Sequence, residues 1–317
     1  MQLQPSQDSI DVLSLFLLNH HLSPTSLLAI PFVFSNVYLL CISNQLQRIM
    51  SCHNEDEQTN GFAGGPIHLP ILRNHLIPVR VFQSGFTTST ALQNAHSLIG
   101  QDGAQAAFGS QQGNLAHVSF SDAALSVHRA QSNLPHPIVK PPRPTRNHGP
   151  SSRDLPDPEH AYEAKYPKGS INPAAKIPGG FGFYLAGDNA FKKRCGDGVK
   201  EVIMSYRMML EQGWMWAKGG KLPGMFGGEG DKAYGCSGGR KDSRCTCFDV
   251  RLMWRANGEG ELYTYLPPVP SNDKVLCAIP PRSIRNNDYG YSVGRGSFNL
   301  NDAVGRWMGV ALRGRCV

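Results

Sequence analysis

The sequence predicts an all-β domain in its C-terminal half, and three observations support this prediction. Over residues 162–317 no apolar pattern with the helical period of 3.6 residues is sustained between caps. Residues 201–210 are apolar at nearly every position, which favours a strand buried on both faces, with a short buried helix as the alternative. Residues 247–266 alternate apolar and polar side chains around a Gly-rich turn, which is typical of a β-hairpin.

The hairpin is expected to reverse at residues 257–260, Asn-Gly-Glu-Gly. In the expected register, the numbers of two residues paired across the strands add up to 516, so that Arg251 is opposite Tyr265 and Met253 is opposite Tyr263. Because residues two apart on a strand share a face, one face would collect the polar side chains. That face carries Asp249, Arg251, Tyr263 and Tyr265. The opposite face is predicted to be core and carries Phe248, Val250, Trp254, Leu262 and Thr264.

The chain divides into segments of different composition. It has 317 residues and a net charge of +7, and all of the excess positive charge lies after Pro150. Residues 1–133 are polar and of low complexity after an apolar N-terminal segment, and we expect them to be mostly disordered. Residues 134–158 contain 8 prolines and predict an extended linker, with the alternative that 141–144 (PPRP) binds a proline-recognition module. Residues 159–317 are the predicted β-domain.

Several classes of function are excluded by what the β-domain lacks. The last histidine of the chain is His160, so Ser-His-Asp triads and His-based zinc sites are ruled out in the domain, and no P-loop is present. The basic charge comes without a recognised nucleic-acid motif, so we expect no nucleic-acid partner. The chemistry that remains uses Tyr, Lys and Arg. This set suits β-elimination on a 4-linked uronic acid, in which a cation neutralises the carboxylate, a base removes the C5 proton and a phenol protonates the leaving O4. An open sheet that only binds sugar is the alternative.

Five motifs occur in order between residues 162 and 310, at 166–187, 199–228, 233–255, 261–267 and 288–301. They include GGKLPG, CFDVRLMWR and ELYTYLP, and the chain thereby resembles polysaccharide lyase family 14, in its fungal branch. The resemblance implies a concanavalin A-like β-jelly-roll sandwich whose concave sheet binds acidic polysaccharide, and cleavage of glucuronan or alginate by β-elimination. The family's domain continues with further strands, so the resemblance also implies a sandwich that is incomplete at the C-terminus.

Carried over by motif, the resemblance makes Lys221 the active-site lysine, Arg251 the carboxylate-neutralising arginine, and Tyr263 and Tyr265 the paired acid and base, in undecided order. Asp249 departs from the family, which often has serine there, and its charge would either repel a uronate or orient Arg251. The candidate substrate-binding residues are Asp249, Arg207 and Arg255.

The cysteines and the N-terminus give expectations about compartment and assembly. Three of the 8 cysteines lie close together, and a disulfide from Cys236 to either Cys245 or Cys247 is favoured over a zinc site. A disulfide favours an extracellular protein, although the first basic residue, Arg48, follows both N-terminal apolar runs, so no clean signal peptide is present.

We expect a monomer with no cofactor, no metal and no stable membrane span. A lyase is the favoured function; the alternatives are an inactive carbohydrate-binding sandwich and a non-functional truncated product.

Overall fold

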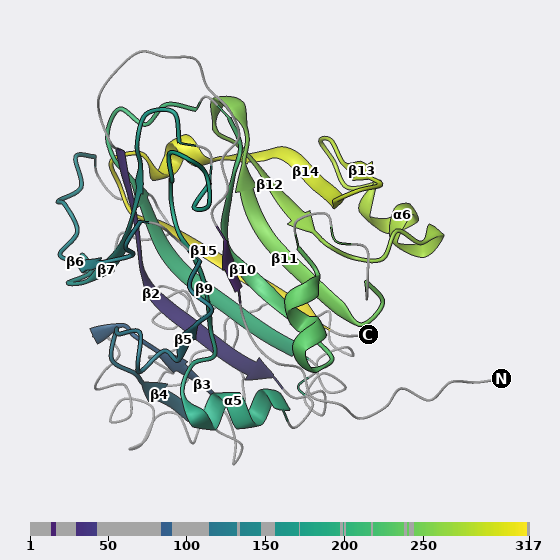
Figure 1. The fold of residues 1–317 in the computed structure, drawn as a ribbon, viewed down its shortest axis with the longest axis horizontal. Coiled ribbons are helices and arrows are strands. Elements are labelled where there is room, and N and C mark those ends of the chain that lie inside the picture. Colours follow the sequence, from purple (N-terminus) through teal and green to yellow (C-terminus); the bar gives the residue numbers. More distant parts are fainter. Residues whose placement is uncertain are drawn as a thin grey trace, which may run out of the picture.

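Two β-sheets stacked face to face form the body of the protein in a computed structural model (Figure 1). The structure describes residues 14–16, 30–42, 84–90, 114–131, 134–146, 156–170, 172–196, 199, 201–216, 218–237, 240 and 244–315. The predicted all-β sandwich is confirmed, and residues 201–210 form a strand rather than the alternative helix.

The first sheet has eight strands in the order β13-β14-β12-β11-β10-β1-β8-β5. Their bounds are β1 Ser14–Phe16, β5 Val127–His128, β8 Gly182–Leu185, β10 Gly220–Gly228, β11 Cys247–Trp254, β12 Glu259–Thr264, β13 Ile284–Asn286 and β14 Gly290–Asn299. The central pairs of this sheet, from β10 to β14, are antiparallel.

The second sheet follows the order β15-β9-β2-β3-β4, and β7 joins it through β2 and also pairs with β6. Its strands are β2 Ile30–Ile42, β3 Ser84–Thr87, β4 Asn114–His117, β6 Ile138–Val139, β7 Ala161–Tyr166, β9 Glu201–Leu210 and β15 Met308–Arg315. The helical segments are short: α5 Asn189–Gly196, α6 Pro270–Leu276, η4 Gly230–Gly235, η5 Ala256–Gly258 and η6 Leu300–Ala303.

The main core lies between the two sheets. Both sheets contribute fully or almost fully buried side chains to it, among them Phe183, Tyr206, Met208, Met225 and Trp254. Aromatic edge-to-face contacts extend this core, as between Trp254 and Trp214, whose ring centroids are 5.9 Å apart. Because these side chains come from strands far apart in the sequence, the core holds the sheet that carries the polar face in a fixed position.

Segments before residue 134 take part in the sandwich, and the prediction that residues 1–133 are mostly disordered stays a prediction. Strand β2, from the apolar N-terminal run, pairs with β9 on one side and with β3 and β7 on the other. Pairing along both edges of β2 satisfies its backbone hydrogen-bonding groups, which favours a place for this run inside the sheet. The remainder of residues 1–133 lies outside the described residues. Across the described part of the chain, no helix has the length and apolar character needed to cross a membrane.

The described part of the proline-rich segment lies against the sandwich rather than apart from it. Strand β6 pairs with β7, and the amides of Thr145 and Arg146 both donate to the carbonyl of Gly305, at 2.8 and 3.0 Å. Within this segment, Ile138–Val139 has strand backbone, and the extended linker stays a prediction. The domain boundary at 134–158 stays a prediction.

The hairpin of β11 and β12 forms as predicted, but its register is shifted by two. Arg251 opposes Tyr263, and Trp254 opposes Gly260, so paired residue numbers sum to 514 and the predicted sum of 516 is wrong. The turn is centred one residue earlier than predicted, at Asn257, which takes a positive φ of 61°, and the Arg255 amide donates to the Glu259 carbonyl at 2.8 Å. Because the shift is even, the same side chains still share one face.

Candidate functional site

A β-bulge in β10 directs Lys221 onto the polar face of the first sheet. Lys221 opposes Met253, whereas Gly224 opposes Arg251, so β10 carries one extra residue between these pairs. Pro223, which has no backbone N–H to donate, lies in this irregular step. A Cβ atom on Gly224 would lie 2.3 Å from the Val250 carbonyl oxygen, so glycine is required there for β10 to approach β11. The GGKLPG motif therefore has a structural reason for its Pro and Gly.

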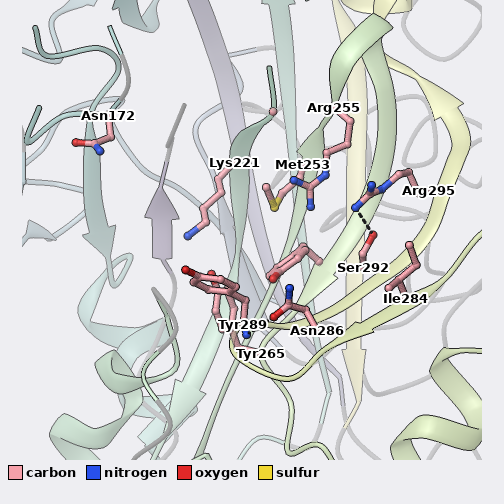
Figure 2. Close-up of a pocket in the computed structure, with 12 residues that line it drawn as sticks. Asn172, Lys221, Met253, Arg255, Tyr265, Ile284, Asn286, Tyr289, Ser292 and Arg295 are labelled. Atoms are coloured by element: carbon pink, nitrogen blue, oxygen red, sulfur yellow. Dashed lines mark hydrogen bonds between the residues drawn. The ribbon is translucent and has the colours of Figure 1, made fainter. Parts of the chain in front are cut away.

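A cavity of about 700 Å³ opens on this face of the sheet (Figure 2). Its walls come from β10 to β14 and the adjoining loops. The lining residues are Asn172, Gly219, Lys221, Met253, Arg255, Tyr263, Tyr265, Ile284, Asn286, Tyr289, Ser292 and Arg295. Among the described residues that line the cavity there is no aspartate or glutamate, but there are two arginines and a lysine. The described residues contain no group of three or more His, Cys, Asp or Glu that could hold a metal ion.

Lys221 is a lining residue whose ionisation is strongly altered. Its side chain is only 7% exposed, and burial, followed by the positive charges of Arg251 and Arg255, holds its pKa well below the usual range for lysine. Its ammonium nitrogen lies 5.4 Å from the ring centroid of Tyr265. A lysine with a lowered pKa is unprotonated at a lower pH than usual, and it can then accept a proton.

The two predicted tyrosines lie together beside Lys221. The ring centroids of Tyr263 and Tyr265 are 5.3 Å apart, and both side chains are buried at the cavity wall. The Tyr265 amide donates to the Asp249 carbonyl at 2.7 Å, which continues the strand ladder past the end of β12. Burial, reinforced by Tyr265 and Glu261, raises the pKa of Tyr263. Tyr263 therefore keeps its proton at neutral pH, so it can act there as a proton donor but not as a base.

Arg251 lies beneath the cavity rather than in its wall. Its side chain is 0% exposed, and its Nε donates to Asp249 Oδ1 at 2.9 Å, while Nη2 also contacts Oδ2. Burial lowers the pKa of Arg251 to about 10, so the guanidinium stays charged at neutral pH. The predicted roles of Arg251 and Asp249 stay predictions: the two charged groups contact each other, and neither residue is among those that line the cavity.

We expect Asp249→Asn to lower the free energy of unfolding by about 3 to 5 kcal/mol, because it leaves a buried guanidinium without its counter-charge. Denaturant unfolding monitored by fluorescence measures the loss. The matched control is Asp302→Asn, which breaks an exposed pair with Arg306 and should change stability by less than about 1 kcal/mol. Equal effects for the two variants would contradict a structural role for the buried pair.

Glu261 binds two arginines of the cavity wall, Arg255 and Arg295, on the other side of the cavity from Lys221. The sequence analysis did not identify this group. Its buried carboxylate accepts from Arg255 Nε at 2.8 Å, Arg295 Nε at 2.5 Å and Ser292 Oγ at 2.6 Å. Burial opposes ionisation of Glu261, but these hydrogen bonds outweigh it and hold its pKa below the usual value. Arg255 was a predicted binding residue; Glu261 and Arg295 are new. Glu261 could have been predicted, because it lies two residues before Tyr263 on the same strand and therefore on the same face.

Arg207 is not brought to this cavity. It lies in β9 of the second sheet, is fully buried, donates from Nη1 to the Pro156 carbonyl at 2.6 Å and faces the ring of Trp307. These contacts tie β9 to neighbouring segments of the second sheet, so the predicted substrate contact of Arg207 is not supported.

Cys236 and Cys247 form a disulfide, which settles the two pairings left open by the sequence. Cys245 is free and exposed. Both bonded cysteines lie in the buried cluster that also contains Tyr263 and Tyr265, so the disulfide holds η4 and its loop against the start of β11 beside the cavity.

Replacing both Cys236 and Cys247 with alanine is expected to lower the free energy of unfolding by about 3 kcal/mol. The bond closes a loop with a sequence separation of 11, and restricting the unfolded chain by a loop of this length has an effect of that size. Thermal unfolding measures it, with Cys245→Ser as the control that should leave the midpoint unchanged. A double variant as stable as the control would show that the disulfide adds nothing to stability.

The sequence model of the family Polysaccharide lyase 14 matches residues 156–314. Among solved structures, the chain is similar to a marine PL-14 alginate lyase from Aplysia kurodai, with 28% sequence identity and a TM-score of 0.43. That similarity covers 59% of this chain and 61% of the other, so the chain spans less than two thirds of that structure's length. No curated protein matches the sequence significantly.

Proposed function

The chain belongs to polysaccharide lyase family 14, whose sequence model covers half of it, and we propose that it cleaves a 4-linked polyuronate by β-elimination. The observation that carries this proposal is Lys221, a buried lysine with a lowered pKa in the wall of a cavity shared with two tyrosines and two arginines. A base of this kind, beside phenols and cations and with no acidic side chain among the described lining residues, suits abstraction of a proton next to a carboxylate.

The proposed reaction assigns proton abstraction to Lys221 with Tyr265, and proton donation to Tyr263. The unprotonated Lys221 nitrogen takes the C5 proton, the C5–H electron pair forms the C4=C5 double bond, and the C4–O4 bond breaks. The departing O4 takes a proton from Tyr263, whose raised pKa keeps that proton in place until it is needed. Atoms and charges balance with no water consumed, and the new chain end is an unsaturated uronate.

Arg251 acts in this proposal through its charge. It is one of the two arginines that lower the pKa of Lys221, and its guanidinium carbon lies 6.0 Å from the centroid of the Tyr265 ring. The buried cation thereby favours the unprotonated form of Lys221. Asp249 limits this field and fixes the guanidinium in place.

The experiment that tests the proposal is the ultraviolet absorbance of the unsaturated product. The full chain is incubated with a glucuronan-type polymer, with alginate and with a neutral 4-linked glucan. We expect absorbance to grow on a uronate polymer and to stay flat on the glucan. Flat traces on both uronate polymers from a chain that unfolds cooperatively would refute the proposal.

A second candidate is a carbohydrate-binding sandwich without catalysis, and the Asp249–Arg251 ion pair favours it. Because Asp249 engages Arg251 below the cavity, this arginine does not reach a bound sugar. Such a protein would bind oligouronates, as measured by calorimetry, without forming any absorbing product.

We also propose that the protein works in an oxidising, extracellular compartment. The Cys236–Cys247 disulfide supports this proposal, because such bonds persist outside the reducing cytosol. Recovery of the protein with this bond intact from culture medium tests it; exclusive recovery from the cytosol with free thiols would contradict it.

A further inference from the structure

The cavity has a second cationic centre that is independent of Arg251. Arg255 and Arg295 both line the cavity, at the end opposite Lys221 in Figure 2, and both are bound to the fully buried Glu261. Two guanidiniums and one carboxylate leave this group with one net positive charge. The Arg255–Glu261–Arg295 cluster, as we call it, is therefore the main source of positive charge in the cavity wall.

The two other cationic residues, Arg251 and Lys221, contribute less positive charge to the cavity than the cluster does. Asp249 compensates the charge of Arg251, whose side chain does not line the cavity. Lys221 is favoured in its unprotonated form by burial and by the neighbouring arginines. A substrate carboxylate entering the cavity consequently meets its positive counterpart at the cluster.

The cluster is built for binding at fixed positions. Arg255 uses Nε and Nη2 on Glu261, whereas Arg295 uses Nε on Glu261 and Nη2 on Ser292 Oγ, at 3.0 Å. Their side chains remain 27% and 23% exposed, so both guanidiniums still present N–H groups toward the cavity. Arginine held by a buried carboxylate loses little further side-chain freedom when it binds an anion.

The backbone of β14 is shaped to bring Arg295 to this place. The ladder between β12 and β14 shifts between Gly260 and Leu262, and β14 accommodates extra residues there. Gly294 and Gly296, with φ of 60° and 88°, flank Arg295. The Arg295 amide donates to the Arg282 carbonyl at 2.7 Å, which anchors the irregular segment.

We infer that Arg255 and Arg295, positioned by Glu261, bind the carboxylate of the polyuronate in this protein, in place of Arg251. This inference rests on the proposed function, because it assumes a uronate in the cavity. Arg255 and Arg295 would contact the substrate directly. Glu261 is a positioning residue, which acts through the two arginines.

The test compares binding of a short oligouronate and of a neutral oligoglucan by calorimetry, using the full chain and its variants. Arg295→Gln and Arg255→Gln are each expected to weaken oligouronate binding by about 10- to 100-fold, the loss typical of one charge-assisted hydrogen-bonding group. Binding of the neutral oligoglucan should be unaffected. Arg295→Lys, which keeps the charge but loses the planar fork, should recover part of the affinity.

The matched control is Arg306→Gln, which removes the same charge from an arginine that pairs with Asp302 away from the cavity lining. It should bind both ligands as the wild type does. Glu261→Gln should raise KM for the polymer more than it lowers kcat, whereas a purely structural role would lower the amount of folded enzyme and leave KM unchanged.

The outcomes separate this inference from the proposed function. Wild-type cleavage of polyuronate together with unchanged oligouronate affinity in both arginine variants would overturn the inference and leave the lyase proposal standing. A wild-type chain that folds but neither binds nor cleaves polyuronate would overturn both. Equal losses for the charged and the neutral ligand would assign the cluster a structural role instead.

Discussion

Lys221→Met is expected to reduce kcat on polyuronate by at least about 100-fold, since a positioned general base contributes at least that much to a proton transfer. The unbranched methionine fills a similar volume at a site that is only 7% exposed, so the fold should be retained. Steady-state kinetics followed by the ultraviolet absorbance of the product measure the loss. The exposed Lys165, which pairs with Glu163, provides the control variant Lys165→Met with wild-type kcat.

The lowered pKa of Lys221 also predicts how kcat/KM and stability of the wild type depend on pH. Because the pKa of Lys221 is lowered in the folded protein, wild-type kcat/KM should fall as pH drops through that lowered pKa, where the amine becomes protonated. Between the folded and unfolded pKa values the unfolded chain binds the extra proton, so wild-type stability falls as pH decreases across this window. Lys221→Met should lose this pH dependence and be more stable than the wild type at neutral pH. A variant that keeps wild-type turnover would remove Lys221 from the mechanism.

Tyr265→Phe is the second substitution for which we expect a large loss of turnover. The centroid of the Tyr265 ring lies 5.4 Å from the Lys221 nitrogen and 5.3 Å from the centroid of the Tyr263 ring, and we propose that its hydroxyl takes part in the proton transfer. Turnover should fall by about 100-fold or more, with oligouronate affinity nearly intact, because the ring and its packing are preserved.

The matched control for Tyr265→Phe is Tyr234→Phe, whose hydroxyl contacts the His128 Nε2 at 2.9 Å outside the cavity lining. This control should retain wild-type turnover. Loss of binding in Tyr265→Phe without loss of turnover at saturation would show that the phenol holds the substrate and transfers no proton.

The polar face of the hairpin could be predicted from sequence, whereas its register could not. Alternation along residues 247–266 fixes which side chains share a face, and that result survives any even shift. The shift from 516 to 514 depends on Asn257 adopting a positive φ, which the dipeptide Asn-Gly permits at more than one turn position.

The long-range features needed the structure. The pairing of β2 with β9 joins residues about 170 positions apart, and no local pattern in the sequence specifies that partner. Likewise, Glu261 and Arg295 meet only because β14 is irregular opposite β12. The proximity of Asp249 and Arg251 was visible from their spacing, but whether Asp249 repels a uronate or holds Arg251 was decided by burial and by the 2.9 Å hydrogen bond.

The central claim is that this chain breaks a polyuronate by elimination, and mass spectrometry of its products in ¹⁸O-labelled water tests it most directly. The full chain is incubated with a defined oligouronate, and both fragments of each cleavage are weighed. Elimination predicts fragments whose masses add up to that of the substrate, with an unsaturated end on one and no ¹⁸O incorporated by cleavage. Fragments that together exceed the substrate by one labelled water would show hydrolysis and contradict the account.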